Sequence, residues 1–413
     1  MSEFLHDRDQ ALPVGLVYAS DPEDAGFDSQ KLRRAAGVVE SALHACGGPI
    51  RSASLSVVRA GRVVLTRTWE EPANRPYLVA SLTKPVTALG ALLLLQEGQL
   101  YLDAKVSDIL PEFGRRGKEA IRLRHLLTHT SGLPDMLPQN LELRAAHAPL
   151  GEYYARLQEI EPLFQPGSQV WYQSMGFLVL ARLIEALSGQ TLPSFLSGRV
   201  FLPLGLTATS LGVKGTDLGV EVQLPDDQVG KDWNWNSPYW RALGAPWGGL
   251  LATSLDLAAL IYAVGSASFK IGGGSYRVGS ARGANRLLAP QIQAAMRLNQ
   301  TEGLSYFDGT PTYGATDSTT SNLSGTAPAW GLGWRLNVES RRSSTLFGDL
   351  ASPQAFGHTG ATGTAFWYDP ECDVAFCLLT TWPAAIREKV AARVSNAVLS
   401  AIADAEICDA PGA

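Results

Sequence analysis

Residues 81–84 read Ser-Leu-Thr-Lys, and the residues from Thr83 to Gln96 carry the pattern of an apolar helix. Residues three apart on a helix share a face, so the ammonium of Lys84 can reach the hydroxyl of Ser81. A desolvated lysine has a lowered pKa and can act as a base toward serine. Ser81 would lie at the helix N-terminus, whose dipole favours negative charge nearby. This stretch predicts a serine nucleophile beside its base.

In a chain with eight lysines, one S-x-x-K element has roughly even odds of arising by accident, so this reading needs further support. Two further motifs provide it. Tyr172-Gln173-Ser174 precedes an apolar helical run from Phe177 to Leu187. The third motif, residues 357–363, reads Gly-His-Thr-Gly-Ala-Thr-Gly and enters a strand.

Together the three motifs resemble the S-x-x-K, Y-x-N and K-T-G trio of class C β-lactamases, penicillin-binding D,D-peptidases and family VIII carboxylesterases. The resemblance runs from about Asp28 to the C-terminus and also rests on the stretches 124–134 (RHLLTHTSGLP), 203–206 (PLGL), 248–253 (GGLLAT) and 330–334 (WGLGW). It identifies the chain as similar to the β-lactamase and penicillin-binding protein superfamily.

The order of predicted elements agrees with an α/β (α+β) fold of the β-lactamase/transpeptidase type. Strands are expected at 52–58 and 62–68, joined by Ala60-Gly61, and at 365–368 and 373–380; helices are expected at 28–43, 83–96 and 384–403, with residues 100–260 mainly helical. Strands at both ends of the chain predict an antiparallel sheet built from both termini. We expect a single catalytic domain over 1–413, with a sheet lobe at about 1–80 and 290–413 and an inserted, mainly helical lobe at about 81–289.

The resemblance implies a role for each motif residue. Ser81 is the nucleophile, Lys84 its general base and Tyr172 a second proton shuttle. The backbone N–H groups of Ser81 and Ala361 form the oxyanion hole, where one donor is typically worth about 100- to 1,000-fold in rate. His358 completes the catalytic set, and the expected substrate contacts within the motifs are Ser174, Thr359 and Gly360. Trp247 is a further candidate contact, because it belongs to a tryptophan-rich segment between the second and third motifs that could line an apolar acyl pocket; core packing is the alternative explanation.

Two positions depart from the family pattern. Position 174 is Ser where β-lactamases have Asn, and position 358 is His where they have Lys. A lysine is a permanent cation suited to the carboxylate of penicillins and D-alanyl peptides. A histidine with its ordinary pKa is mostly neutral at pH 7 and gains charge toward pH 6. This departure favours neutral esters as substrates.

Several other classes of function are not indicated. The formal charge of −5 and the pI of about 5.8 argue against nucleic-acid binding. No secretory signal or membrane-spanning segment is evident, and the scattered cysteines suit a reduced, cytoplasmic protein. His125 and His129 have a metal-like i, i+4 spacing but no third ligand, so neither a metal nor another cofactor is expected. Glycine- and serine-rich stretches at 265–285 and 301–327 read as surface loops.

The sequence therefore predicts a cofactor-free serine hydrolase that forms an acyl-serine intermediate, with a small-molecule ester or amide as substrate. A carboxylesterase acting on small to medium acyl esters is the first hypothesis. The alternatives are a β-lactamase, a D-amino-acid or D,D-peptidase, an acyltransferase, and an inactive binding protein on the same fold. The oligomeric state stays open.

Overall fold

A hairpin near the start of the chain begins the main sheet. Ala60 and Gly61 join strands β2 (Ala53–Arg59) and β3 (Arg62–Trp69), with φ angles of 49° and 73°. Two successive positive φ values are what a tight hairpin turn requires, so this predicted hairpin is confirmed. The computed structural model describes residues 7, 10–213, 215–267, 269, 286–308, 328–338 and 346–403.

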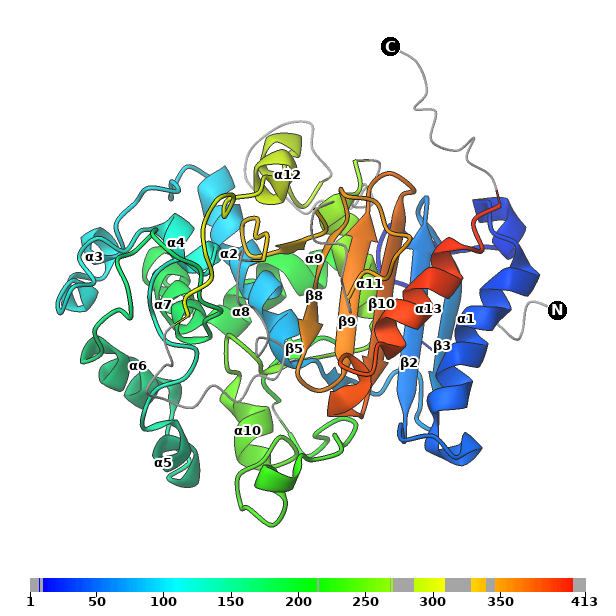
Figure 1. Cartoon of the computed structure of the whole chain (residues 1–413), viewed down its shortest axis with the longest axis horizontal. Coiled ribbons are helices and arrows are strands. Elements are labelled where there is room, and N and C mark those ends of the chain that lie inside the picture. Colours follow the sequence, from blue (N-terminus) through cyan, green and yellow to red (C-terminus); the bar gives the residue numbers. More distant parts are fainter. Residues whose placement is uncertain are drawn as a thin grey trace.

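Strands from the other end of the chain complete a seven-stranded sheet in the order β1-β3-β2-β10-β9-β8-β7 (Figure 1). The added strands are β1 (Val17–Tyr18), β7 (Arg335–Leu336), β8 (Phe356–Gly360), β9 (Thr364–Asp369) and β10 (Val374–Thr380). Each pair is antiparallel except β1 with β3. The predicted mixed α/β fold, with a sheet built from both termini, is confirmed.

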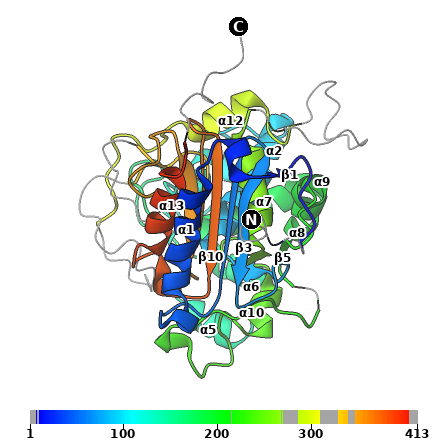
Figure 2. The same cartoon turned by 90° about the vertical axis from the view of Figure 1, so that its right-hand side faces the viewer.

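Helices cover both faces of this sheet. Helices α1 (Ser29–Ala42) and α13 (Val390–Leu399) pack side by side on one face (Figures 1 and 2). Asp28 caps α1 by accepting the N–H of Lys31 at 2.9 Å. Helix α11 (Ser254–Gly265) packs against β2, β9 and β10. It therefore covers the sheet, although it falls in the range predicted for the helical lobe; the division into two lobes stays a prediction.

Most of the helices between the two halves of the sheet lie to one side of it (Figure 1). The predicted helix after the nucleophile is α2 (Thr83–Gln96), which packs on α7 (Met175–Ser188). The others are α3 (Val106–Ile109), α4 (Leu123–Leu127), α5 (Asn140–Ala145), α6 (Leu150–Gln158), α8 (Leu192–Leu196), α9 (Leu202–Leu204), α10 (Pro238–Leu243) and α12 (Pro290–Arg297).

A second, three-stranded sheet lies within the region expected to be mainly helical. It consists of β4 (Tyr77–Leu78), β6 (Leu250–Ala252) and β5 (Ser210–Leu211), in that order. Strands of two or three residues are too short to show an alternating pattern, so the sequence carried no signal for them. This sheet matters for function because β4 leads directly to the nucleophile and β6 lies beside the base.

Two other expectations need correction. The helix predicted at 384–403 is shorter, because Lys389 has a φ of 59° that separates α13 from a 3-10 turn at Pro383–Ala385. The loop predicted at 301–327 is not wholly at the surface: Tyr306 is buried and forms a β-bridge with Val170. Most of that loop and of the one at 265–285 lies outside the described residues.

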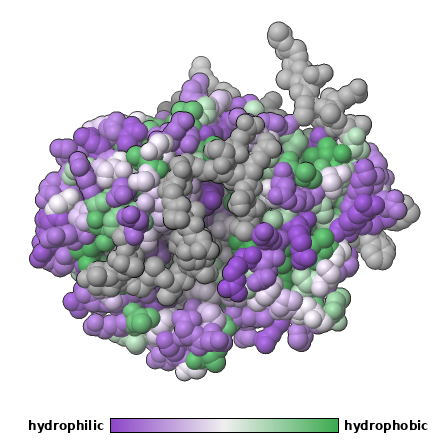
Figure 3. All heavy atoms as spheres, in the orientation of Figure 1, coloured by the Kyte–Doolittle hydropathy of each residue, from purple (hydrophilic) through white to green (hydrophobic). Residues whose placement is uncertain are grey.

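On the face seen in Figure 3, hydrophilic side chains predominate and the hydrophobic ones form separate patches. Within the described ranges, no single helix has the length and apolar character of a membrane span; α7 and Leu192–Leu204 reach it only as a pair bent by 72°. Cys46, Cys372 and Cys377 are free thiols, as expected. Cys372 lies in the turn before β10.

Candidate active site

Ser81 lies in a 3-10 turn (Ala80–Leu82) that leads directly into α2. Its side chain is largely buried, and Lys84 is 1% exposed. The Nζ atom of Lys84 donates to the Oγ of Ser81 at 3.0 Å and to the backbone oxygen of Trp247 at 3.2 Å. The three-residue spacing thus brings the expected nucleophile and the expected base into hydrogen-bond contact.

Two threonines tie the start of α2 to the segment that holds Trp247. Thr83 donates to the backbone oxygen of Ala80 at 2.6 Å and accepts the N–H of Leu250 at 3.0 Å. One turn later, Thr87 donates to the backbone oxygen of Pro246 at 2.7 Å. Because both hydroxyls are buried, these bonds fix Ser81 and Lys84 against the small sheet.

Two further threonines lock the turn between β8 and β9 onto the backbone just before Ser81. Thr362 donates to the oxygen of Leu78 at 2.7 Å, and Thr364 donates to that of Val79 at 2.9 Å. Ala361 is the first residue of this turn, immediately after β8, and not part of the strand edge. Within the described part of the chain, no hydrogen bond uses the N–H of Ser81 or of Ala361.

Tyr172 lies in the segment between Val170 and helix α7, and its ring is beside the base. The Nζ of Lys84 is 4.5 Å from the ring centroid of Tyr172. The rings of His129, Trp330 and His358 surround it at centroid distances of 4.7, 5.9 and 6.0 Å. The three motifs therefore meet in space: Lys84 touches Tyr172, and Tyr172 faces His358.

His358 differs from its expected behaviour. Burial, reinforced by the charge of Lys84, lowers the pKa of His358 to about 3. The expectation that His358 gains charge toward pH 6 is wrong. The residue is only 3% exposed, and the sequence does not reveal this burial. Its Nδ1 donates to the backbone oxygen of Thr359 at 2.6 Å, which leaves Nε2 as an acceptor.

Ser174 faces a carboxylate that the sequence analysis did not single out. Its hydroxyl donates to Oδ1 of Asp135 at 2.6 Å, and its N–H donates to the backbone oxygen of Asp135 at 3.3 Å. At position 174 the family pattern has an asparagine, whose amide can donate a hydrogen bond to a ligand. The hydroxyl of Ser174 instead donates its proton to Asp135. No spacing rule links positions 135 and 174, so only the fold reveals this pair.

The remaining expected substrate contacts are placed as follows. Thr359 is partly exposed at the end of β8, and Gly360 follows it. A Cβ on Gly360 would lie 2.3 Å from the oxygen of Val79, so only glycine allows this close approach. Trp247 is buried, and its ring contacts Tyr153 at 5.9 Å; its contact with the site is through its backbone oxygen.

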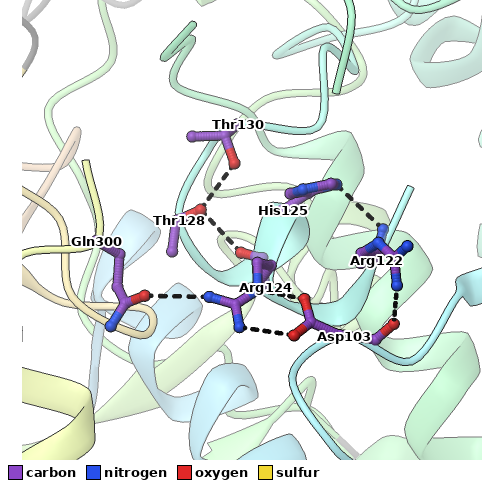
Figure 4. A network of polar contacts seen from close by, with 7 residues as sticks. All are labelled: Asp103, Arg122, Arg124, His125, Thr128, Thr130 and Gln300. Atoms are coloured by element: carbon purple, nitrogen blue, oxygen red, sulfur yellow. Dashed lines mark hydrogen bonds and ion pairs between the residues drawn. The ribbon is translucent and has the colours of Figure 1, made fainter. Parts of the chain in front are cut away.

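A polar network supports the segment 122–131, which carries His129 beside Tyr172 (Figure 4). Arg124 holds Asp103 with two bonds of 2.6 and 3.0 Å and also reaches Gln300 at 3.4 Å. Thr128 donates to the backbone oxygen of Arg124 at 2.8 Å and lies 2.9 Å from the hydroxyl of Thr130. The network anchors this segment to two other parts of the chain.

The pair His125 and His129 does not form a metal site. Helix α4 ends at Leu127, and His129 follows with a φ of 60°, so the two rings do not share a helix face. Each Nδ1 accepts a backbone N–H instead, from Arg122 and Gln173 respectively. In the described part of the chain, no group of three His, Cys, Asp or Glu residues could hold a metal ion.

Comparisons with known proteins show what the chain is similar to. The sequence model of the family described as Beta-lactamase matches residues 39–399. A relative from Salmonella agona, described as "Putative D-alanyl-D-alanine carboxypeptidase", is 26% identical over 423 residues, covering 90% of this chain and 88% of the relative.

Two solved structures share the fold. The hydrolase EstCE1, described as having promiscuous acyltransferase activity, superposes with a TM-score of 0.67 at 19% identity, covering 90% of this chain and 99% of its own. A family VIII carboxylesterase superposes with a TM-score of 0.64 at 18% identity, covering 93% and 99% respectively.

Proposed function

The chain belongs to the β-lactamase family, and from this premise we propose that it is a serine carboxylesterase acting on neutral esters with small to medium acyl groups. The observation that carries the proposal is the state of His358. Where the family pattern has a lysine cation, this chain has a buried imidazole that stays uncharged down to about pH 3. Such a site offers no fixed charge at position 358 to a substrate carboxylate.

The proposed reaction begins at Ser81. Lys84, 3.0 Å from the hydroxyl, takes its proton as Oγ attacks the ester carbonyl. The N–H groups of Ser81 and Ala361 stabilise the charge that develops on the carbonyl oxygen. Tyr172, in contact with Lys84, passes the proton to the leaving alcohol, and the acyl group remains on Ser81. Water then attacks the acyl-serine with the same groups acting in reverse.

Asp135 supports the same substrate class. Its carboxylate holds the hydroxyl of Ser174, so negative charge lies at a position where the family pattern has a neutral amide. Asp135 attracts the guanidinium of Arg144, which is buried between Trp233 and Trp240. The Cζ of Arg144 makes cation–π contacts with these two rings, 5.0 and 4.6 Å from their centroids. A substrate carboxylate beside Ser174 would be repelled.

The test is a panel of p-nitrophenyl esters, from acetate to octanoate, measured beside nitrocefin and a D-alanyl-D-alanine peptide. We expect kcat/KM for the best ester to exceed that for nitrocefin by at least about tenfold, a difference in line with one missing charge-assisted hydrogen bond. Ser81→Ala should abolish ester hydrolysis and labelling by a fluorophosphonate while the fold is retained. A wild type that prefers nitrocefin would contradict the esterase assignment, and Arg335 on β7, near His358, would be the next cation to replace.

Acyl transfer is the second candidate, and it rests on the likeness to EstCE1. In that case an added alcohol competes with water for the acyl-serine, and a new ester appears. Hydrolysis of p-nitrophenyl butyrate in the presence of an alcohol, with both products quantified, distinguishes the two. If no transfer product forms, the chain is a hydrolase only; absence of any labelling at Ser81 would instead indicate an inactive binding protein.

A further inference from the structure

We propose that His129 is the positioning residue for Tyr172, and that it acts through the hydrogen-bond acceptor on its ring. The inference rests on the proposed function, in which Tyr172 carries a proton. It concerns a different question: what holds that phenol in place beside Lys84.

The first observation is that His129 binds the backbone on both sides of Tyr172. Its backbone oxygen accepts the N–H of Trp171 at 2.8 Å, and its Nδ1 accepts the N–H of Gln173 at 3.1 Å. Tyr172 is the residue between these two bonds.

The second observation is direct contact between the rings. The imidazole of His129 stacks on the ring of Tyr172, with centroids 4.7 Å apart and planes inclined by 28°. Trp330 contacts the same imidazole at 4.2 Å, and Phe177 contacts it at 5.5 Å. His129 is fully buried in this aromatic cluster, so its own orientation is fixed by packing.

The third observation is the protonation state that the geometry imposes. An Nδ1 that accepts an N–H must lack a proton, so the ring is neutral with its hydrogen on Nε2. Burial lowers the pKa of His129 well below its ordinary value, and the neighbouring Lys84 and His358 act in the same direction. The acceptor therefore persists through the working pH range.

Residues other than His129 also hold the segment around Tyr172 in place. Gln173 is buried, and its amide donates to the backbone oxygens of His125 and Leu126 at 3.2 Å each, while the hydroxyl of Ser131 donates to its Oε1. The bond from Arg124 to Asp103 and that from Thr128 to the backbone oxygen of Arg124 hold the same segment (Figure 4). Proton transfer depends steeply on geometry, so a loosened Tyr172 should slow the reaction more than it weakens substrate binding.

Two substitutions distinguish the effect of the hydrogen-bond acceptor of His129 from that of its aromatic ring. In His129→Asn, Oδ1 takes the place of Nδ1 because both atoms are attached to Cγ, and asparagine readily adopts the positive φ of this position. In His129→Phe, the aromatic ring remains and the acceptor is lost. We expect kcat to fall about 30- to 100-fold in His129→Phe with KM changed less than about twofold, and His129→Asn to retain at least about a third of kcat.

His125 provides the matched control. It lies on the same segment, and its Nδ1 also accepts a backbone N–H, from Arg122 at 3.2 Å. The N–H that this Nδ1 accepts belongs to Arg122 at the start of α4, and not to a residue next to Tyr172. His125→Phe should therefore change kcat less than about threefold, whatever it does to the melting temperature. Equal losses in His125→Phe and His129→Phe would overturn the proposal.

A double mutant shows whether His129 acts through Tyr172. His129→Phe combined with Tyr172→Phe should be no slower than Tyr172→Phe alone, whereas independent roles would multiply. If His129→Phe does not fold, His129→Gln replaces it, since its amide extends one carbon further and moves the acceptor away from the Nδ1 position. The rate of labelling of Ser81 by a fluorophosphonate serves as a second readout that needs no ester substrate.

The outcomes are distinguishable. An active His129→Phe, a His129→Asn as slow as His129→Phe, or multiplicative losses would each overturn the role of His129 and leave the proposed function intact. A fully active Tyr172→Phe would contradict the proposed role of Tyr172, and the inference about His129 would fall with it.

Discussion

The substrate preference of this protein should not depend on the charge of His358 at any pH above about 5. The perturbation is pH alone, from 7.5 to 6.0. With a pKa of about 3, only about 0.1% of His358 is protonated at pH 6. With the ordinary pKa of about 6.5, the protonated fraction would rise from about 9% to about 76% over the same interval. In this second case the amount of cation offered to a substrate carboxylate would rise roughly eightfold, whereas with a pKa of about 3 it stays negligible throughout.

The assay is the ratio of kcat/KM for nitrocefin to that for p-nitrophenyl butyrate. Ser81, Lys84 and Tyr172 would acylate with both substrates, so their titration cancels in the ratio. What remains is the recognition of the carboxylate, which only nitrocefin carries. We expect the ratio to change by less than about 1.5-fold between pH 7.5 and 6.0, because His358 stays neutral throughout.

A permanent cation at the same position provides the positive control. His358→Lys should shift the ratio toward nitrocefin by roughly ten- to a hundredfold, the range expected for one charge-assisted hydrogen bond of about 1.5–3 kcal/mol. A wild-type ratio that rises several-fold toward pH 6, with an apparent pKa near 6.5, would refute the reasoning. It would mean that His358 is solvated and charged during turnover.

Three other predictions follow from the site and its surroundings. Lys84→Ala and Tyr172→Phe should each lower kcat by about 100-fold or more, and the double mutant should be little worse than the poorer single one; steady-state kinetics decide. Gly360→Ala should cost about 100-fold in kcat, because its Cβ would lie 2.2 Å from the hydroxyl of Thr364, whereas Gly37→Ala in open space should leave kcat unchanged. The depressed pKa of His358 makes its contribution to stability fully present well above pH 6.5 and progressively lost as pH falls below that value. His358→Asn should therefore reduce the drop in the wild-type free energy of unfolding between pH 6.5 and 5 by about 1.7 kcal/mol, measured by urea unfolding.

The sequence by itself determined the elements whose causes are local. The Ala60-Gly61 turn, the cap at Asp28 and the apolar helix after Ser81 each depend on residues within a few positions of one another. The contact between Ser81 and Lys84 is of the same kind, because a helical turn joins them. The family resemblance then related the second and third motifs to this pair, with no need of coordinates.

Tertiary structure decided the chemistry that depends on burial and on partners far along the chain. The pKa of His358 is set by the exclusion of water from its ring, which no residue pattern reports. Asp135 meets Ser174 across 39 residues, and His129 meets Gln173 across 44. These contacts form only when residues 122–135 fold back against the residues just before α7. The physical reason is that short-range patterns specify dihedral angles, whereas solvation and long-range hydrogen bonds exist only once the chain has packed.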